Sequence, residues 1–154
     1  RNIPHHVALI REGVISEVGT TAEVFRRLSK TLASFAALEN TFTGVAQTTE
    51  NGTTLVNIGN DVQIEATTHD VGAVSIFVSP EDIIISKDRF TSSARNLFKG
   101  RIVEIADLGS LVRLRVDVGK IFTIQITKLS FNEMKLDLDT EVFVAFKASS
   151  VQTV

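Results

Sequence analysis

Two short stretches of the sequence combine cations with hydroxyl groups in a way that suits the binding of an oxyanion. The first contains Ser93 and Arg95, and the second contains Lys147, Ala148 and Ser149. Charge-assisted hydrogen bonds are the strong ones, so a tetrahedral dianion requires donors on all sides and no carboxylate nearby. Together the two stretches supply cations, hydroxyls and backbone N–H groups, which predicts that they contribute to one anion site.

An internal repeat sets these stretches apart from the rest of the chain. The pattern N-x-F-x-G occurs at residues 40–44 and again at 96–100, and a series of strand-like segments follows each copy. Such self-similarity indicates two related units. In the corresponding places the first copy carries Glu39 and Glu81, and its Pro80 has no N–H to donate. An anion site is therefore expected in the second copy only.

The charge distribution agrees with this expectation. Residues 1–90 hold 7 Lys or Arg and 11 Asp or Glu, whereas residues 91–154 hold 9 and 7. The net charge of the whole chain is −2, which argues against a general nucleic-acid-binding protein. Aromatic platforms for bases are also lacking, because there is no Trp or Tyr and both Phe122 and Phe146 fall on the apolar sides of their strands.

Most of the chain from residue 42 onward alternates apolar and polar side chains, as half-buried strands do. Strands are predicted at 62–66, 73–78, 83–85, 102–105, 112–118, 122–126 and 141–147. Asn51-Gly52 predicts a tight hairpin, and Gly100, Gly109 and Gly119 are expected in turns. Many short strands at regular spacing predict two small OB-like β-barrel units.

The first forty residues differ, because they alternate strand and helix signals. Residues 7–10 and 14–18 are predicted as strands, a helix capped by Thr20 follows, and a second helical stretch is expected at 32–38. A single helical turn is predicted later, with Ser130 as its cap. The predicted fold class is therefore mainly β with a short α/β lead-in.

Several kinds of chemistry find no support in the sequence. There is no cysteine, which excludes disulfides, thiolate metal sites and cysteine nucleophiles. None of the nine glycines begins the G-x-x-x-x-G-K-[ST] loop that cradles phosphates, so no ATP hydrolysis is expected. The three histidines, at positions 5, 6 and 69, are expected to be solvated. No apolar run reaches the roughly 20 residues that cross a bilayer. The chain does not begin with Met, as expected of a piece of a longer protein.

Parts of the sequence resemble known families. Residues 93–100, 126–130 and 147–149 are similar, in this order, to the Mop (molbindin-like) domain, which binds molybdate or tungstate. Residues 7–25 look like the last strands and helix of an ABC-transporter ATPase domain, and residues 78–83 resemble part of the regulatory (TOBE) region of such proteins. The resemblance implies the C-terminal regulatory region of a molybdate/tungstate ABC importer ATP-binding protein.

The resemblance also implies how the chain is divided. Residues 1–40 would be a remnant of the ABC ATPase domain, residues 41–91 a first OB-like β unit, and residues 92–154 a Mop-like oxyanion-binding β unit. The chain itself would not be an enzyme, whereas the full-length parent would be an ABC-type ATPase.

The binding groups of the Mop domain can be carried over residue by residue. They are Ser93, Arg95, Thr127, Ser130, Lys147, Ala148 and Ser149. Pockets in that family lie at dimer interfaces, so a homodimer is implied in which two chains contribute to each pocket. Arg95 and Lys147 would neutralise the dianion, and hydroxyls and the Ala148 N–H would donate hydrogen bonds. Neither a cofactor nor a metal–protein bond is implied, because the metal of molybdate or tungstate arrives inside its own oxygen shell.

A mechanism follows from the resemblance as well. Oxyanion that accumulates in the cytoplasm would stabilise one arrangement of two regulatory domains, and uptake would stop if that arrangement holds the ATPase domains apart. This feedback is known as trans-inhibition. The implied partners are the rest of the ATPase domain and, through it, the membrane permease subunit, which places the chain in the cytoplasm at the inner face of the membrane. Molybdate and tungstate have nearly the same size and charge, so the sequence does not distinguish them.

Other interpretations stay open at this point. Ser130 could be only a helix cap, Thr127 an outward strand residue, and Arg95 and Lys147 solvated surface cations. The chain could then be a ligand-free regulatory and dimerisation domain of a sugar or polyamine importer ATPase. A free-standing molybdate store would not need residues 1–40, and no helix-turn-helix precedes the barrel as a molybdate-responsive transcription factor would require.

Overall fold

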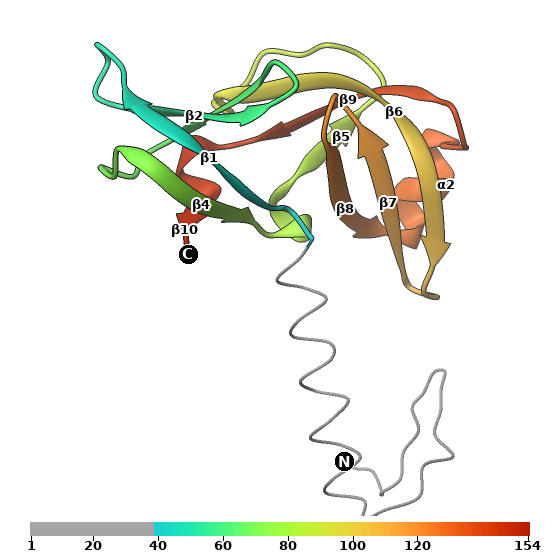
Figure 1. The fold of residues 1–154 in the computed structure, drawn as a ribbon. Helices are drawn as coiled ribbons and strands as arrows, with labels where there is room; N and C mark the ends of the chain where they lie inside the picture. The colour runs from blue at the N-terminus through green and yellow to red at the C-terminus, as the bar shows by residue number, and fades with distance from the viewer. Residues whose placement is uncertain (1–38) are drawn as a thin grey trace, which may run out of the picture. The chain divides into compact units, whose positions relative to one another are not determined.

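The computed structural model describes residues 39–154, which form ten strands in two five-stranded antiparallel sheets (Figure 1). We refer to these sheets as sheet A and sheet B. The strands predicted at 7–10 and 14–18, the helix after Thr20 and the helical stretch at 32–38 lie outside the described residues. Within residues 39–154 the fold is mainly β, as predicted from the alternation of apolar and polar side chains.

Sheet A is built mainly from the first repeat. Its strands are β1 (Thr41–Thr48), β2 (Thr54–Gly59), β3 (Val62–Ala66), β4 (Gly72–Val78) and β10 (Val151–Thr153), in the order β10-β4-β1-β2-β3. The hairpin predicted at Asn51-Gly52 joins β1 to β2. Gly52 has a φ of 84°, which glycine adopts without steric cost, and Thr49 N–H donates to the Thr53 carbonyl at 2.8 Å.

Sheet B is built mainly from the second repeat. Its strands are β5 (Ile84–Ser86), β6 (Asn96–Asp107), β7 (Leu111–Asp117), β8 (Ile121–Thr127) and β9 (Glu141–Phe146), in the order β5-β9-β6-β7-β8. The short helical elements are η1 (Pro80–Asp82), α2 (Lys128–Met134) and η2 (Ala148–Ser150). The strands predicted at 112–118, 122–126 and 141–147 each agree with β7, β8 and β9 to one residue at either end, whereas 102–105 is only the middle of the long strand β6.

The two repeats exchange their last strands. β5, which ends the first repeat, pairs with β9 of sheet B, with Ile85 opposite Val144. β10, which ends the second repeat, pairs with β4 of sheet A, with Val151 opposite Val78. Each sheet therefore contains four strands of one repeat and one strand of the other. Alternation along a strand reports which face is buried and not which strand lies beside it, so this exchange was not predicted.

The asparagine of the N-x-F-x-G motif explains how each repeat is held to the other. Asn40 accepts a hydrogen bond from Thr123 N–H and donates one to the Thr123 carbonyl, both at 2.7 Å. Asn96 does the same with Glu65, at 2.8 Å and 2.9 Å. Asn40 and Asn96 are 2% and 3% exposed, so each buried amide satisfies two backbone groups of the opposite sheet. We call each of these pairs of hydrogen bonds, Asn40 with Thr123 and Asn96 with Glu65, a bracket. The two brackets are equivalent, which supports the duplication inferred from the sequence.

The phenylalanine of the motif lies in the shared core. Phe42 and Phe98 pack on Phe122 with ring centroids 5.0 Å and 6.0 Å away, and Phe146 lies 5.6 Å from Phe122. Phe122 is fully buried and Phe146 is 1% exposed, which confirms that both belong to the core. Aromatic pairs at these distances contribute beyond their buried area, so this cluster is a principal link between the repeats.

The glycine of the motif permits close approach of the next strand. A Cβ on Gly44 would lie 2.3 Å from the carbonyl oxygen of Asn57, and one on Gly100 would lie 2.6 Å from that of Asp117. Gly100 was expected in a turn, and this prediction is wrong. It lies inside β6, where glycine marks close backbone approach instead of a reversal of the chain. Gly109 and Gly119 do lie in turns, with φ of 96° and 112°.

Candidate functional site

Arg95 and Lys147 lie beside each other at one end of sheet B. Asn96, the first residue of β6, pairs with Phe146, the last residue of β9. Arg95 precedes Asn96 and Lys147 follows Phe146, so the two cations come next to each other just beyond this pair. Both side chains are exposed, and no carboxylate in the described part of the chain pairs with Lys147. The structure therefore brings the two predicted stretches together at one end of a strand pair.

The remaining predicted groups of these stretches are close neighbours of the two cations along the chain. Ser93 is exposed in the segment before β6. Ala148 begins η2, is 5% exposed, and η2 lies against β3 of sheet A. Ser149 is exposed on the same helical turn. Ser93, Ala148 and Ser149 are thus close in sequence to the two cations, and the partner of the Arg95 side chain is Glu65.

A carboxylate also lies at this place, contrary to expectation. Glu65 of β3 pairs with Arg95 through Oε2 and Nε at 3.1 Å, and the same oxygen accepts from the Thr53 hydroxyl at 2.9 Å. The prediction that the second copy has no nearby carboxylate is therefore wrong. Glu65 belongs to the first repeat and reaches Arg95 because the Asn96 bracket draws β3 against the start of β6. An anion at Arg95 would have to compete with it.

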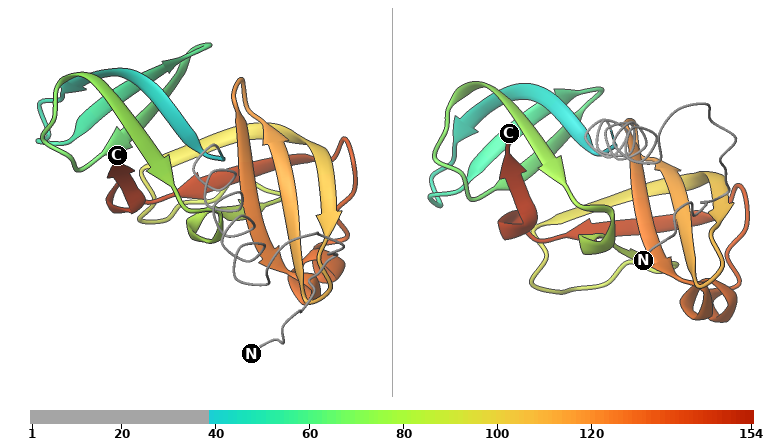
Figure 2. Two further views of the ribbon diagram at one scale, coloured as in Figure 1. Left: turned by 60° about the horizontal axis from the view of Figure 1, so that its bottom comes forward. Right: turned by 90° about the horizontal axis from the view of Figure 1, so that it is seen from below.

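Thr127 and Ser130 lie at the opposite end of sheet B. Asp107 at the far end of β6 pairs with Val112, and the neighbouring Leu111 pairs with Thr127. Figures 1 and 2 show α2, which follows Thr127, at the end of the sheet remote from η2 and β10. Within one chain the structure does not bring these two hydroxyls to Arg95 and Lys147.

The cap of α2 also differs from the prediction. Ser130 was expected to begin the helical turn, but the helix starts at Lys128 and its cap is Thr127. The Thr127 hydroxyl oxygen accepts from Ser130 N–H at 3.1 Å, and the two hydroxyl oxygens are 3.1 Å apart. Threonine and serine are both good caps, so the spacing of polar residues alone did not choose between them.

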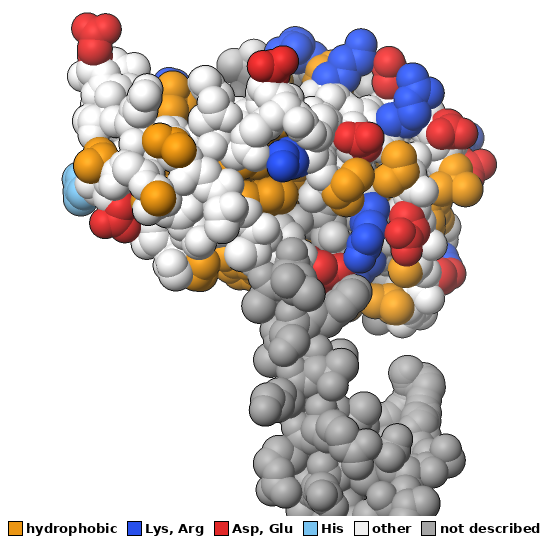
Figure 3. Space-filling view, viewed as in Figure 1, with side chains coloured by type: hydrophobic (Ala, Val, Ile, Leu, Met, Phe, Trp, Pro, Cys, Tyr) orange, Lys and Arg blue, Asp and Glu red, His pale blue; other side chains and the backbone are white. Residues whose placement is uncertain are grey.

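The cation nearest this end is already neutralised. Lys128 forms an ion pair with Asp107, and the resulting hydrogen bond, followed by one from Gly109 N–H, lowers the pKa of Asp107 below its usual value. Most other cations of sheet B are paired as well, for instance Lys99 and Arg101 with Glu141. Figure 3 shows Lys and Arg side chains interspersed with carboxylates over this part of the molecule. Lys147 forms no ion pair within the described residues, and the same is true there of Lys87, Lys120 and Lys135.

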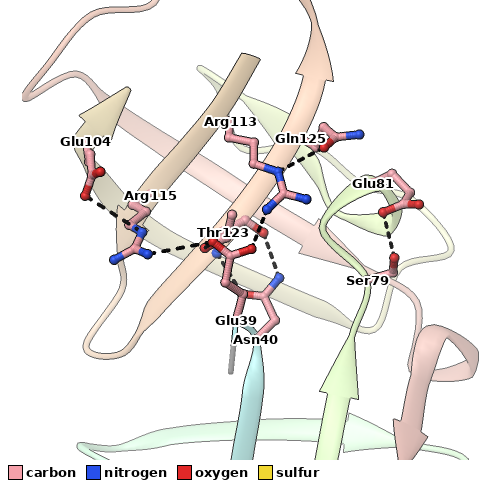
Figure 4. Close-up of polar contacts among 9 residues, drawn as sticks. All are labelled: Glu39, Asn40, Ser79, Glu81, Glu104, Arg113, Arg115, Thr123 and Gln125. Carbon is pink, nitrogen blue, oxygen red and sulfur yellow. Dashed lines mark hydrogen bonds and ion pairs between the residues drawn. The ribbon is translucent and has the colours of Figure 1, made fainter. Parts of the chain in front are cut away.

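A second charged cluster occupies the matching place of the first repeat (Figure 4). The Glu39 carboxylate forms an ion pair with Arg113 and lies 3.7 Å from an Arg115 nitrogen and 3.5 Å from the Thr123 hydroxyl. Arg113 also donates to Gln125 at 3.0 Å. In the sequence, Glu39 served only as evidence against an anion site in the first repeat. The two arginines were missed, because alternation along β7 indicates merely that they are polar residues on one face.

Ser79 and Glu81 form a small motif of their own beside this cluster. The Ser79 hydroxyl donates to Glu81 Oε1 at 2.7 Å. This bond is the main reason why the pKa of Glu81 is below its usual value, with the Glu81 backbone N–H and the charge of Arg113 adding to it. A depressed carboxyl pKa stabilises the fold above the pKa of the unfolded chain, and that contribution is lost as pH falls through the folded value.

We expect Ser79→Ala to raise the pKa of Glu81 towards the usual glutamate value, because the largest cause of the depression is removed. The measurement is an NMR titration of the glutamate side-chain carboxyl carbons in both proteins. Ser110→Ala, which replaces an exposed serine elsewhere in the chain, is the control and should leave the Glu81 midpoint unchanged. An unchanged Glu81 midpoint would contradict the role of the Ser79 hydroxyl.

A family comparison gives the class of the C-terminal part of this chain. Residues 92–152 match the TOBE domain. The β-rich fold and this match together define residues 92–152 as a TOBE domain, and not as the catalytic domain of an ATPase.

Relatives of known type extend the comparison over most of the chain. It is 37% identical over 147 residues to the molybdate/tungstate import ATP-binding protein WtpC of Pyrococcus horikoshii, covering 94% of this chain and 41% of that protein. The protein of the same name from Pyrococcus abyssi is 36% identical over 149 residues, covering 95% of this chain and 41% of that protein. The chain thus spans about two fifths of the length of these relatives.

A solved structure confirms the type of fold. The cytoplasmic molybdate-binding protein ModG, with molybdate bound, aligns with a TM-score of 0.63 and 20% identity, covering 74% of this chain and 94% of that chain. The fold is therefore of the Mop type. The resemblance inferred from the sequence, to Mop and TOBE domains of molybdate/tungstate importer ATP-binding proteins, is confirmed.

Two further findings concern residues 39–154. No helix there is long and apolar enough to cross a membrane. That part of the chain also contains no group of three or more His, Cys, Asp or Glu side chains that could hold a metal ion.

Proposed function

We propose that this chain is the regulatory part of a molybdate/tungstate importer ATPase and that it binds the oxyanion directly. The observation that carries the proposal is the pair of adjacent cations, Arg95 and Lys147, at the Asn96–Phe146 end of the TOBE domain. Lys147 has no carboxylate partner within the described residues, so its charge is available to a ligand. The names of the relatives, which refer to import of these two ions, supply the ligand class.

The proposed site needs two chains. Ser93, Arg95, Lys147, Ala148 and Ser149 would act from one protomer. Thr127 and Ser130 would act from its partner, since within one chain they lie at the far end of sheet B. This arrangement requires a homodimer, and the oxyanion is held through hydrogen bonds with no metal–protein bond and no cofactor.

Within the parent protein the site would report the cytoplasmic concentration of the imported ion. In this proposal residues 1–40 are the end of the ATPase domain, residues 41–91 a first OB-like unit, and residues 92–154 the oxyanion-binding unit. Binding to one arrangement of two such regions favours that arrangement. Uptake would be inhibited if it holds the ATPase domains apart beneath the permease, at the inner face of the membrane. An ATPase rate of the full-length transporter that stays constant while oxyanion binds would contradict this mechanism.

One observation favours a different function. Glu65 already pairs with Arg95 at 3.1 Å and partly neutralises the proposed site. A ligand-free TOBE-type domain that dimerises and regulates through protein contacts would need no external anion. Arg95 is 59% exposed, however, and ion pairs of such exposure contribute little, so a divalent oxyanion can displace the carboxylate from it.

Isothermal titration of the chain with tungstate, molybdate and sulfate tests the proposal. We expect binding of the first two ions, weaker binding of sulfate, and a loss of affinity of about 10- to 100-fold in Arg95→Ala, because a hydrogen bond to a charged group contributes about 1.5–3 kcal/mol. Arg101→Ala removes a cation of similar exposure from β6, the strand that Arg95 precedes, and should leave the affinity unchanged.

The same titration separates the two candidate functions. Glu65→Gln removes the competing charge and should strengthen binding if Arg95 is a ligand-binding group. A folded dimer that releases no heat with any of the three ions, both as wild type and as Glu65→Gln, would leave only the ligand-free regulatory domain. Sedimentation equilibrium on the same samples establishes whether the protein is a dimer.

A further inference from the structure

The equivalence of the two brackets assigns a counterpart to Arg95, the arginine of the proposed anion site. Asn40 and Asn96 hold Thr123 and Glu65 by the same pair of hydrogen bonds. The residues that precede the two asparagines, Glu39 and Arg95, therefore stand in equivalent places. The first repeat has an acid where the second repeat has a base.

Strand register extends the correspondence to the neighbouring strands. Thr123 pairs with Arg115, and Glu65 pairs with Leu55, so Arg115 is the counterpart of Leu55. Two residues earlier along each strand, Arg113 is the counterpart of Thr53. The close approaches at the motif glycines give the same alignment, because Gly100 meets Asp117 where Gly44 meets Asn57.

The charges at the two places are consequently reversed. In the second repeat one arginine of the loop before β6 faces the carboxylate of Glu65. In the first repeat two arginines of β7 face the carboxylate of Glu39. Arg113, Arg115 and the Thr123 hydroxyl together form a set of donors of the kind that binds oxyanions, since guanidinium groups match carboxylate and tetrahedral oxyanions with parallel N–H donors.

Glu39 fills this donor set. Its side chain is 7% exposed, and both oxygens are occupied, one by Arg113 and the other by Arg115 and Thr123. A buried carboxylate persists only when it is paired and hydrogen-bonded, as this one is. The two arginines are 30% and 38% exposed, so they can be reached from solvent.

We propose that the Arg113–Arg115–Thr123 cluster is a second, latent oxyanion-binding position that the chain closes with its own Glu39 carboxylate. The ligand that it would take is a small oxyanion, such as sulfate, tungstate or formate, in place of the glutamate side chain. A chain of this kind has one position exposed to external anion and one that is permanently filled. The donors lie on β7 and β8, where Arg115 is also 3.8 Å from the Glu104 carboxylate (Figure 4), and none of them is Arg95. The proposal therefore does not depend on binding at Arg95.

Glu39→Ala tests the proposal, because it removes the tethered carboxylate and leaves its donors in place. We expect a lower melting temperature in sodium chloride, and a rise of several degrees on addition of sulfate or formate at constant ionic strength, since a ligand that binds only the folded state stabilises it by mass action. The wild-type melting temperature should rise less under the same change. In titrations the double variant Glu39→Ala/Arg95→Ala should bind one anion per chain, and Arg95→Ala alone should not.

A second substitution added to Glu39→Ala shows whether the anions act at the arginine cluster. Adding Arg113→Gln to Glu39→Ala should abolish the response to anions, whereas adding Arg101→Ala should not. If Glu39→Ala does not fold in the presence of any of the anions, Glu39→Gln takes its place, because it keeps the bulk of the side chain and loses its charge. Its melting temperature should also rise on addition of the anions, but by a smaller amount. Equal responses of variant and wild type to sulfate and formate would overturn the proposal, even where the site at Arg95 binds tungstate normally. Failure of the Arg95 site would leave the anion response of Glu39→Ala intact.

Discussion

Replacement of Gly100 by alanine is expected to lower the free energy of unfolding by about 3 kcal/mol, at the upper end of the usual effect of overpacking. A Cβ at this position would lie 2.6 Å from the Asp117 carbonyl oxygen and 2.6 Å from Val118 Cγ1. The first contact is with backbone, which cannot rotate away as a side chain can. β6 and β7 would have to separate locally, and the pairing of Arg101 with Asp117 would be strained.

Urea denaturation followed by circular dichroism measures this effect. Lys99→Ala is the matched control, because Lys99 precedes Gly100 on the same strand and its side chain is 57% exposed. A surface substitution of this kind should change stability by no more than about 0.5 kcal/mol. Similar midpoints for wild type and Gly100→Ala would show that the strands relax without cost and would contradict the role assigned to the motif glycine.

The second large effect is expected from the two bracket asparagines. Asn40→Ala should cost about 3–4 kcal/mol, because two buried backbone groups of Thr123 lose their partners, at about 1–3 kcal/mol each. Alanine would also have to keep the φ of 56° that Asn40 adopts, which asparagine tolerates better. Asn96→Ala removes the equivalent bonds to Glu65 without that positive φ, so its cost should be smaller, about 2–3 kcal/mol.

The order of the two effects is the informative result. Asn57→Ala is the control, because that exposed side chain only accepts a hydrogen bond from Gly59 N–H at the register shift of β2. This substitution should lower the free energy of unfolding by much less than Asn40→Ala or Asn96→Ala does. If Asn96→Ala destabilised the protein more than Asn40→Ala, the argument from burial and backbone conformation would be wrong.

The comparison of repeats succeeded because it used information that sequence carries directly. Asn, Phe and Gly recur at the same spacing since each has a role that other residues perform poorly: bracketing a strand, filling the core and permitting close approach. The prediction that Gly100 lies in a turn was wrong for a related reason. Glycine is selected both by turns and by close packing of strands, and its presence alone does not tell which.

The candidate anion site was predicted in part. Arg95 and Lys147 were expected together and lie just beyond the same end of the β6–β9 pairing, where Asn96 is opposite Phe146. Glu65 was not expected there, since it lies thirty residues away on another repeat and reaches Arg95 only through the Asn96 bracket. The separation of Thr127 and Ser130 from the cations likewise follows from the length of β6, which a list of residue types does not contain.

The sequence by itself determined the β-rich fold, most strand positions, the two-fold repeat and the identity of the cations, because these depend on local alternation and on residue type. Only the tertiary structure decided that the repeats exchange β5 and β10, that Glu65 reaches Arg95 and that Glu39 closes a donor set built from Arg113 and Arg115. Those features depend on which strands lie beside one another. Alternation of apolar residues buries a face equally well against many partners, and the choice among them is made by long-range packing and hydrogen bonding.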